Sequence, residues 1–502
     1  MKRIPLLPFF FVFLFTSALT AQNFTLPDDH DRTVETTHQI IINGQKIPYK
    51  AITGYQPVLN DDREPIAALS YTYYKRTDIK DDIRRPLMIS FNGGPGSASV
   101  WMHLAYTGPK VLRIDDEGFP IQPYGVKDNP HSILDVADIV FVNPVNTGYS
   151  RILDKDKEVD REQFFGVNQD IAYLSEWINM FVTRVNRWRS PKYLIGESYG
   201  TTRVSGLALA LQGRQWMYLN GVILVSPTEL GVHTGTGRRE GPLGASLRLP
   251  YFTAAAWYHE KLPTDLQSKD LAEVLPLAED YAVNELMPII AKGGFVNDAE
   301  KNKAAEMMAR YSGISKEVIL QYNLDVPTSF FWKELLRNEG NTIGRLDSRY
   351  KGIDKTDAGT SPDFNSELTS WLHAFTPAIN YYFANHLNFK TDTKYNMFGP
   401  VGPWDRSGNN SGENLRQAMA QNPYLHTMVQ SGYYDGATKY FDAKYTMWQI
   451  DPSGKMKDRF SFKGYRSGHM MYLRAEDLKN ANDDIREFIN NSLPPAGTPA
   501  KY

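Results

Sequence analysis

The pentapeptide Gly196-Glu197-Ser198-Tyr199-Gly200 contains the residue types of a serine nucleophile held on a tight turn. It follows a short apolar run at residues 193–195 and precedes a segment with helical periodicity at residues 204–211. Gly-x-Ser-x-Gly between a strand and a helix is typical of a nucleophile elbow, in which small flanking residues tolerate a strained turn that exposes the serine hydroxyl. We therefore expect acyl chemistry through a covalent ester on Ser198.

A serine nucleophile needs a general base and an acid that orients the base. In sheets of this kind the chain order is serine, then Asp or Glu, then His. Asp435 follows an apolar strand run at residues 425–429, so it lies where a loop leaves the carboxyl end of a strand. His469 lies in a glycine-containing loop, whereas His426 falls inside that strand run. We expect Asp435 and His469 to complete the triad; an ordinary Asp-Gly turn and a surface histidine are the alternatives.

A second glycine-rich segment, Asn92-Gly93-Gly94-Pro95-Gly96, follows the apolar strand run at residues 87–91. Glycines let the backbone approach a tetrahedral intermediate, and their amides can donate to its oxygen. In hydrolases of this architecture one such amide comes from the loop after the third strand, and the other comes from the residue after the nucleophile. This pattern assigns the oxyanion hole to the amides of Gly94 and Tyr199.

The segments around these residues alternate between strand and helix patterns. Residues 167–185 carry apolar side chains at spacings of three and four, which predicts an amphipathic helix. Asn43-Gly44 between two apolar runs predicts a β-hairpin. The later alternation predicts a mostly parallel central sheet flanked by helices, which is an α/β fold. Further strand-like runs occur at residues 67–74, 86–91, 139–142 and 221–225.

The chain divides into segments of different character. Its first residues combine two basic side chains, a short apolar run and small residues, which predicts a secretory signal peptide cleaved after Ala21. The alternation of strands and helices stops after residue 227 and returns near residue 425, and the part between is loop-rich and then helical. The expected division is a signal peptide (1–21), a first part of the core (22–227), an inserted helical cap (228–394), a second part of the core (395–493) and a flexible tail (494–502).

The composition argues against several classes of function. The 502 residues include 55 Lys and Arg against 57 Asp and Glu, so the chain has no basic excess to attract nucleic acid or an anionic membrane. The absence of cysteine excludes a cysteine nucleophile and a thiolate metal site. The histidines have no metal-binding spacing, and no phosphate loop or dinucleotide fingerprint occurs. We expect no metal, no cofactor, no nucleic-acid partner and a secreted or periplasmic bacterial protein.

Together the motifs resemble the serine carboxypeptidases, peptidase family S10 of the α/β-hydrolase superfamily. The family's order is followed by the segments 92–97, 143–150, 196–200 and 468–470, and the segments 251–256 and 344–347 look like the bacterial branch. The resemblance implies an α/β-hydrolase fold with an inserted cap and the triad and oxyanion hole named above. It also implies a subsite for the substrate's C-terminal carboxylate, formed by Asn92, the Gly93 amide and Glu197.

The implied subsite carries a physical condition. A carboxylate is repelled by an ionised Glu197, so Glu197 must be protonated to bind it, and an acidic pH preference follows. Two positions depart from the family. Tyr106 occupies the position of a second Glu, two residues before Gly-Pro, and Ser90 occupies the position of a Trp, two residues before Asn92. Both departures concern the carboxylate subsite and leave the triad intact.

Three functions therefore follow from the sequence. The first is a serine-type carboxypeptidase that acts on peptides with a free C-terminal carboxylate. The second is an esterase or acyltransferase with the same triad, which Tyr106 keeps open. The third is a catalytically inactive binding homologue, which is the least favoured because all three triad residue types are present.

Overall fold

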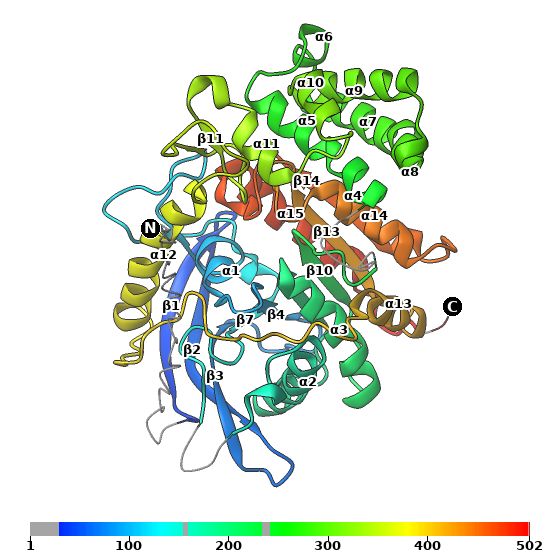
Figure 1. The fold of residues 1–502 in the computed structure, drawn as a ribbon. Coiled ribbons are helices and arrows are strands. Elements are labelled where there is room, and N and C mark those ends of the chain that lie inside the picture. Colours follow the sequence, from blue (N-terminus) through cyan, green and yellow to red (C-terminus); the bar gives the residue numbers. More distant parts are fainter. Residues whose placement is uncertain (1–29, 154–158, 233–240, 500, 502) are drawn as a thin grey trace, which may run out of the picture.

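A ten-stranded sheet forms the centre of the protein in a computed structural model that describes residues 30–153, 159–232, 241–499 and 501 (Figure 1). The expected signal peptide lies outside the described residues. The strand order is β1-β2-β3-β7-β4-β9-β10-β13-β14, and β8 pairs with β3. The strands of this sheet are β1 (Thr33–Ile42), β2 (Gln45–Leu59), β3 (Pro65–Arg76), β4 (Leu87–Phe91), β7 (Asp138–Val142), β8 (Arg151–Ile152), β9 (Lys192–Glu197), β10 (Gly221–Val225), β13 (His426–Gly432) and β14 (Phe460–Tyr465).

The strands from β7 to β14 pair in parallel, whereas β1, β2 and β3 pair in antiparallel fashion. The expected hairpin joins β1 to β2, and Asn43 and Gly44 both have positive φ angles, 50° and 78°, as a two-residue turn requires. Every residue of β4, β7 and β10 is buried, which explains why these strands have continuous apolar sequences. This topology is the α/β-hydrolase fold that the sequence predicts.

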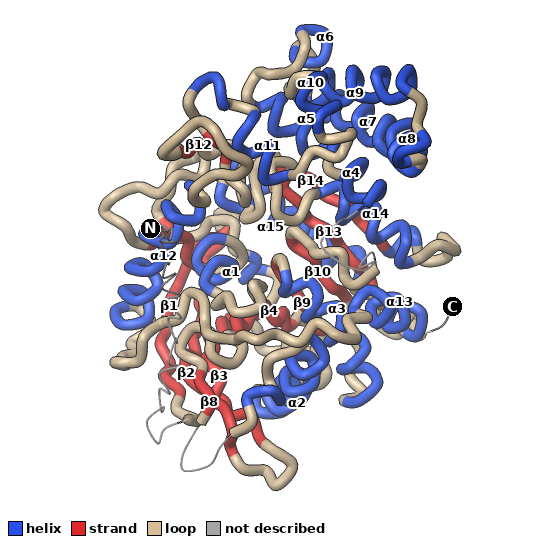
Figure 2. The backbone as a smooth tube through the Cα atoms, in the orientation of Figure 1, coloured by secondary structure: helices blue, strands red, loops and turns tan. Residues whose placement is uncertain are grey.

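Helices cover both faces of the sheet (Figure 2). Successive strand residues point to opposite faces, so Met88 belongs to one hydrophobic cluster and Ile89 to the other. The cluster with Ile89 includes Leu174, Trp177 and other apolar side chains of the expected amphipathic helix. The helices of the core are α1 (Val100–Ala105), α2 (Val167–Arg184), α3 (Tyr199–Arg214), α13 (Ser411–Gln421), α14 (Tyr440–Ile450) and α15 (Ala475–Ser492).

A long, mainly helical segment separates β10 from β13 (Figure 1). Its helices α5 to α11 share a hydrophobic cluster of their own, whereas the aromatic side chains of α12 pack in the cluster of the main sheet. The division into core and cap stays a prediction. The segment contains α4 (Gly241–Leu247), α5 (Leu249–Tyr258), α6 (Thr264–Gln267), α7 (Leu271–Tyr281), α8 (Met287–Ala291), α9 (Asp298–Ser312), α10 (Lys316–Gln321), α11 (Thr328–Glu334), α12 (Ser366–Asn385) and the short strands β11 (Thr342–Ile343) and β12 (Lys351–Gly352). A second small hairpin, β5 (Lys110–Leu112) with β6 (Val126–Asp128), follows α1.

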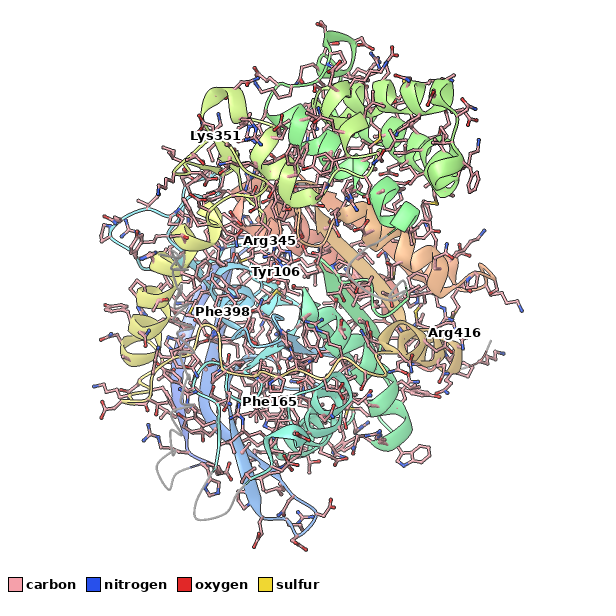
Figure 3. The ribbon with its side chains drawn as sticks, in the orientation of Figure 1. Tyr106, Phe165, Arg345, Lys351, Phe398 and Arg416 are labelled. Atoms are coloured by element: carbon pink, nitrogen blue, oxygen red, sulfur yellow. The ribbon has the colours of Figure 1, made fainter. Side chains whose placement is uncertain are left out.

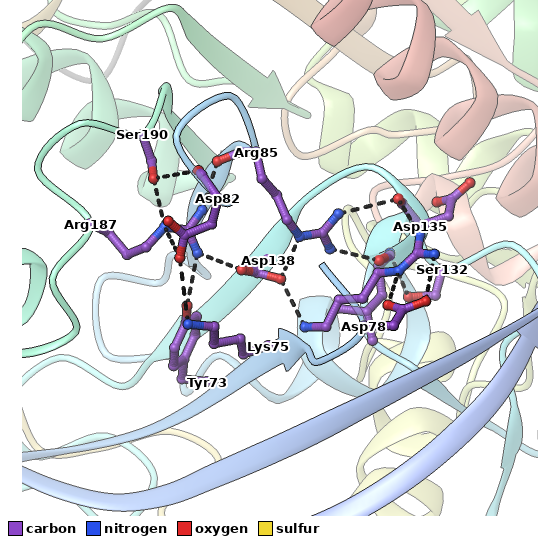
Figure 4. Close-up of polar contacts among 12 residues, drawn as sticks. Tyr73, Lys75, Asp78, Asp82, Arg85, Ser132, Asp135, Asp138, Arg187 and Ser190 are labelled. Carbon is purple, nitrogen blue, oxygen red and sulfur yellow. Dashed lines mark hydrogen bonds and ion pairs between the residues drawn. The ribbon is translucent and has the colours of Figure 1, made fainter. Parts of the chain in front are cut away.

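A buried ion cluster fixes the amino-terminal edge of the parallel strands (Figure 4). Asp138, the first residue of β7, accepts a hydrogen bond from Arg85 Nε at 2.8 Å and pairs with Arg187 through its other oxygen. Neither Asp138 nor Arg187 is exposed to solvent. Tyr73 of β3 also accepts from Arg187, at 3.0 Å. The cluster therefore holds the starts of neighbouring strands together at the edge opposite to their carboxyl ends.

Candidate active site

Ser198 lies on the turn between β9 and α3, because β9 ends one residue before it and α3 begins one residue after it. Its backbone has φ 57° and ψ −126°, a sparsely populated conformation that persists only when surrounding contacts enforce it. Its amide donates to the Val225 carbonyl at 2.9 Å. A Cβ on Gly196 would lie 2.2 Å from the carbonyl oxygen of Gly200, so the turn needs glycine. The pentapeptide has the backbone of a nucleophile elbow.

His469 and Asp435 are in direct contact, although their loops follow different strands. His469 Nδ1 lies 2.7 Å from Asp435 Oδ2. Asp435 Oδ1 also accepts the amides of Ala437 and Thr438, at 2.8 and 3.0 Å, and the Thr438 hydroxyl donates to Oδ2 at 2.7 Å. Donors of this kind stabilise the ionised carboxylate. Asp435 is therefore arranged to hold one ring orientation and one tautomer of His469.

Two opposing effects act on the pKa of His469. Burial lowers the pKa of His469. The charge and hydrogen bond of Asp435, together with the charge of Glu197, raise this pKa by more than burial lowers it, so the net shift is upward. The backbone of His469 is also fixed, since its amide donates to the Leu346 carbonyl at 2.6 Å and its own carbonyl accepts from the Ser226 hydroxyl at 2.7 Å. The ring of His469 is therefore held where the loops that follow β13 and β14 meet.

The contact between Ser198 and His469 is less complete than the contact between His469 and Asp435. Within residues 159–232 and 241–499, the Ser198 hydroxyl makes no hydrogen bond to the imidazole. The charges of His469 and Asp435 nevertheless both act on Glu197, the neighbour of Ser198. The dyad therefore lies beside the elbow, and hydrogen bonds to a nucleophile are often long before substrate binds.

The glycine-rich loop after β4 packs directly on the elbow. A Cβ on Gly93 would lie 2.4 Å from the Tyr199 amide nitrogen and 2.6 Å from the Glu197 carbonyl oxygen. Gly94 has φ +103°, a conformation that favours glycine. Among the described residues, the amides of Gly94 and Tyr199 donate no hydrogen bond. Gly93 therefore lies against the Tyr199 amide, and neither of the two predicted oxyanion donors has an acceptor among the described residues.

A buried arginine of α3 holds this loop in place through a hydrogen bond to its backbone. Arg203 Nη1 donates to the Asn92 carbonyl at 2.6 Å, and Arg203 Nε donates to Asp170 Oδ2 of α2 at 2.7 Å. The side chains of Arg203 and Asp170 are fully buried, so their charges compensate each other. The guanidinium also lies over the ring of Tyr199, 5.4 Å from its centroid. The loop and the elbow thus share one rigid support.

The carboxyl group of Glu197 is buried beside Ser198 and has a hydrogen-bond donor at each oxygen. Asn92 Nδ2 donates to Oε1 at 2.8 Å, and the Tyr472 hydroxyl donates to Oε2. Burial raises the pKa of Glu197 to about 7, although His469 and the two donors act in the opposite direction. A carboxyl with this pKa is mostly protonated at mildly acidic pH. Asn92 and Glu197, both named from the resemblance, are therefore in direct contact.

Tyr106 reaches Glu197 only through another side chain. Its hydroxyl donates to Gln430 Oε1 at 2.6 Å, and its ring stacks on the ring of Tyr472 with a centroid distance of 4.7 Å and an angle of 11° between planes. Ser90 is buried in β4, and its hydroxyl has no hydrogen-bond partner within the described part of the chain. The phenol of Tyr472 therefore contacts Glu197, whereas the resemblance predicts a second carboxyl group as the partner of Glu197.

Two side chains of the site, Tyr472 and Thr438, have no motif in the sequence. Their only sequence signal is proximity, because Tyr472 follows His469 by three residues and Thr438 follows Asp435 by three residues. A backbone segment, residues 345–348, also contributes, since it accepts hydrogen bonds from Gly436 and His469; it overlaps the run at residues 344–347, to which the sequence assigned no role in the site.

The side chain of Arg345 in this segment is exposed, and its guanidinium makes no hydrogen bond or ion pair to any described residue (Figure 3). Its charge lowers the pKa of His469, opposing the upward effect of Asp435. The guanidinium is therefore a solvent-facing positive charge whose field reaches the candidate base.

The described residues carry neither a metal-binding cluster nor a membrane-spanning helix. No group of three or more His, Cys, Asp or Glu side chains there is arranged to hold a metal ion. No helix in the same part of the chain has the length and apolar character needed to cross a membrane.

Comparison with known proteins finds a family model that matches part of the chain. Residues 43–227 match a family model described as serine carboxypeptidase. This range includes the loop at residues 92–96 and the elbow at residues 196–200, and it ends before Asp435 and His469.

Curated relatives match part of the chain. Serine carboxypeptidase-like 37 from Arabidopsis thaliana is 26% identical over 191 residues, which cover 37% of this chain and 36% of that protein. The pheromone-processing carboxypeptidase KEX1 from Saccharomyces cerevisiae is 27% identical over 169 residues, which cover 32% of this chain and 22% of that protein. The matches thus span about a third or less of the length of these relatives.

Solved structures with similar architecture include the Saccharomyces cerevisiae prohormone-processing carboxypeptidase Kex1. Its crystal structure aligns with 89% of this chain and 92% of that chain, with 13% sequence identity and a TM-score of 0.48. A proline iminopeptidase from Mycobacterium smegmatis aligns with 91% of this chain and 98% of that chain, with 11% identity and a TM-score of 0.32.

Proposed function

This chain belongs to the serine carboxypeptidase family, and we propose that it hydrolyses the last peptide bond of peptides that carry a free C-terminal carboxylate. Ser198 is the proposed nucleophile, His469 the general base and acid, and Asp435 the residue that orients His469. The amides of Gly94 and Tyr199 are the proposed oxyanion hole. Asn92, the Gly93 amide and Glu197 are proposed to bind the substrate carboxylate.

The proposed reaction has two halves. In the first, Ser198 Oγ attacks the scissile carbonyl carbon while His469 Nε2 takes the hydroxyl proton, and the amides of Gly94 and Tyr199 donate to the developing oxyanion. The C–N bond then breaks, His469 gives the proton to the leaving amine, and an ester remains on Ser198. In the second half water attacks this ester, His469 takes its proton, and the proton returns to Ser198.

One observation supports the exopeptidase specificity most directly, namely the buried carboxyl of Glu197 next to the nucleophile. Its pKa of about 7 lets it carry a proton at mildly acidic pH, so it can donate a hydrogen bond to a substrate carboxylate. Asn92 already donates to Glu197 and can present its amide to the same ligand. A neutral amide or ester end gains no charge-assisted hydrogen bond in such a subsite.

The same groups set the proposed pH dependence. Binding needs Glu197 in its protonated form, so affinity falls as the pH rises through about 7. Catalysis needs neutral His469, and a charged Glu197 contributes to the raised pKa of this imidazole. With Glu197 protonated that contribution disappears, which lowers the pKa of His469 and favours its neutral form.

A covalent probe tests the acyl chemistry separately from the specificity. A fluorophosphonate is expected to label the protein on Ser198, and Ser198→Ala is expected to abolish the label without unfolding the chain. The matched control is Ser453→Ala, which changes an exposed serine on a turn whose hydroxyl donates to Asp451 Oδ1 at 2.7 Å. Absence of labelling in the folded natural sequence would support the inactive binding homologue instead.

An esterase or acyltransferase remains the second candidate because of a specific contact. A phenol, Tyr472, meets Glu197, and Tyr106 stands behind it, so the subsite has one carboxyl group rather than two. The candidates differ in whether a free carboxylate on the substrate raises the rate.

The remaining predictions concern setting and shape. We propose that the helical segment at residues 228–394 acts as a cap that closes one end of the substrate pocket, as removal of a single terminal residue requires. We also propose a secreted or periplasmic protein, and cell fractionation of the natural host would test that location. The flexibility of residues 494–502 likewise stays a prediction, although Tyr424 donates to the Thr498 carbonyl at 2.6 Å.

A further inference from the structure

The Tyr472 hydroxyl touches the active-site carboxyl that determines the proposed specificity. Tyr472 lies in the short 3₁₀ turn Met471–Leu473, directly after the loop that carries His469, and its side chain is fully buried. It donates to Oε2 of Glu197, while Asn92 donates to Oε1. The carboxyl plane is therefore fixed by donors at both oxygens. One donor comes from the loop after β4, and the other comes from the turn after His469.

The ring of Tyr472 is in turn held by Tyr106, with nearly parallel planes 4.7 Å apart. Tyr106 is itself anchored, because its hydroxyl donates to Gln430 Oε1 at 2.6 Å. The amide of Gln430 donates onward to the Tyr465 hydroxyl at 2.9 Å and to the Ala481 carbonyl at 3.0 Å. Tyr472 thus cannot rotate away from Glu197 without disturbing contacts with β13, β14 and α15.

We propose that Tyr472, supported by the ring of Tyr106, is a positioning residue that orients the Glu197 carboxyl for the substrate's C-terminal carboxylate and favours its ionised form through the hydrogen bond. The inference rests on the proposed carboxypeptidase function. A hydroxyl that donates to a carboxyl group stabilises the charged state more than the neutral state. Tyr472 therefore limits the pH range over which Glu197 stays protonated and able to bind a carboxylate.

Burial, His469, Asn92 and Asp435 also act on the pKa of Glu197. His469 lowers its pKa when charged, Asp435 raises it, and burial is the largest effect and raises it. Tyr106 and Tyr472 stay neutral over the working range, because burial and the charge of Glu197 raise both phenol pKa values. Tyr472 is thus a permanent donor, and its effect on Glu197 can be removed without adding or removing a charge.

The test is the pH profile of kcat/KM for Tyr472→Phe, measured with a blocked dipeptide that has a free carboxylate. In the natural sequence the alkaline limb is expected near pH 7, where Glu197 ionises. In Tyr472→Phe the limb is expected to move to higher pH by roughly one unit, because the charged form loses one donor. KM is expected to rise more than kcat falls, since the change acts on binding of the carboxylate. A limb that stays in place or moves to lower pH overturns the inference.

Two controls separate this role from a general loss of packing. Tyr193→Phe removes another buried hydroxyl, which bonds to Ser492 at 2.8 Å at the opposite end of the strand that leads to Glu197. It is expected to leave the limb unchanged. An ester substrate without a free carboxylate is expected to show no alkaline limb near pH 7 in either protein. A uniform loss of activity at all pH values and with both substrates means that Tyr472 is only structural, which contradicts the proposal.

A second variant covers the case in which Tyr472→Phe does not fold, which thermal melting would reveal. Tyr106→Leu keeps the Tyr472 hydroxyl but removes the stacked ring behind it. It is expected to move the limb in the same direction by a smaller amount, and an unchanged limb contradicts the proposal. The failure of the underlying function is distinguishable, because the natural sequence would then hydrolyse the free-carboxylate and blocked substrates equally well.

Discussion

Asn92 and Glu197 are 105 residues apart in the sequence, yet Asn92 Nδ2 donates to Glu197 Oε1 at 2.8 Å in a buried site beside Ser198. The contact joins the loop after β4 to the nucleophile elbow after β9, two neighbouring parallel strands. It links the part of the site that is proposed to perform acyl transfer to the part that is proposed to recognise the end of a peptide.

The contact between Asp435 and His469 predicts the effect of Asp435→Asn. An asparagine can offer its amide to His469 Nδ1 and so favour the wrong tautomer of the base, and we expect kcat to fall by about 10³-fold or more. Thr438→Val removes one donor to the same carboxylate and is expected to cost about tenfold or less. Steady-state kinetics on both variants measure the two effects. Equal, small losses would argue against Asp435 as the orienting acid.

Gly93 is predicted to be irreplaceable for a steric reason. In Gly93→Ala the new methyl group would lie 2.4 Å from the Tyr199 amide nitrogen, so the loop or the elbow must shift and the proposed oxyanion donors separate. We expect kcat to fall by about 10²–10³-fold. Gly213→Ala is the matched control, because a Cβ there meets no atom within 4 Å. Kinetic constants and melting temperatures of both variants check this prediction, and full activity in Gly93→Ala contradicts it.

Glu197→Gln is predicted to change the pH dependence of activity and of stability. Glutamine is neutral at every pH, so the alkaline limb of kcat/KM near pH 7 should disappear. The pKa of Glu197 is 4.5 in the unfolded chain and about 7 in the folded protein, so the folded state binds the proton of this carboxyl more tightly. The stability that this proton gives to the natural protein is fully present below pH 4.5. That stability is lost as the pH rises from 4.5 to about 7, by roughly 3 kcal/mol relative to the variant.

Chemical denaturation across this pH range measures the stability difference between Glu197→Gln and the natural sequence. Asp477→Asn is the control, because burial also raises the pKa of Asp477, to about 6, and its ion pair is with Arg474 rather than with a residue of the proposed subsite. It should alter the pH dependence of stability while it leaves the alkaline limb of activity in place. Retention of the limb in Glu197→Gln would remove Glu197 from the proposed binding step.

Asp138→Asn is predicted to affect stability without affecting chemistry. The change removes the buried charge partner of Arg187 and leaves it only the more distant Asp82, at 3.7 Å, and loss of one member of a buried pair costs about 3–5 kcal/mol. The cluster lies at the amino-terminal edge of the strands, so kcat/KM of the folded fraction should be unchanged. A denaturation curve and an assay at low temperature check both parts. A specific loss of activity at unchanged stability would contradict this assignment.

Much of the architecture could be predicted because its determinants are local. The hairpin at Asn43-Gly44, the buried parallel strands and the elbow around Ser198 each have a short sequence pattern that dictates backbone geometry. The helix after Ser198 begins at Tyr199, five residues earlier than its apolar periodicity indicates, because the tight turn leads directly into it.

The supports of the site could not be predicted, because they depend on contacts between distant segments. Tyr472 meets Glu197 across 275 residues, and the backbone at Leu346 meets His469 from inside the inserted segment. A tyrosine near a histidine has no distinctive pattern, and a backbone carbonyl has none at all. The replacement of an acidic partner at Tyr106 was visible in the sequence, but the side chain that fills its role was not.

The most direct test of the account compares two substrates that differ only at their end. The ratio of kcat/KM for a blocked dipeptide with a free C-terminal carboxylate to kcat/KM for its C-terminal amide should be measured between pH 5 and 8. The account predicts a ratio of at least about 10²-fold at pH 5.5, corresponding to roughly one charge-assisted hydrogen bond, which decreases as the pH rises through 7. Equal rates for the two substrates at every pH would contradict the carboxypeptidase assignment and favour an esterase or acyltransferase.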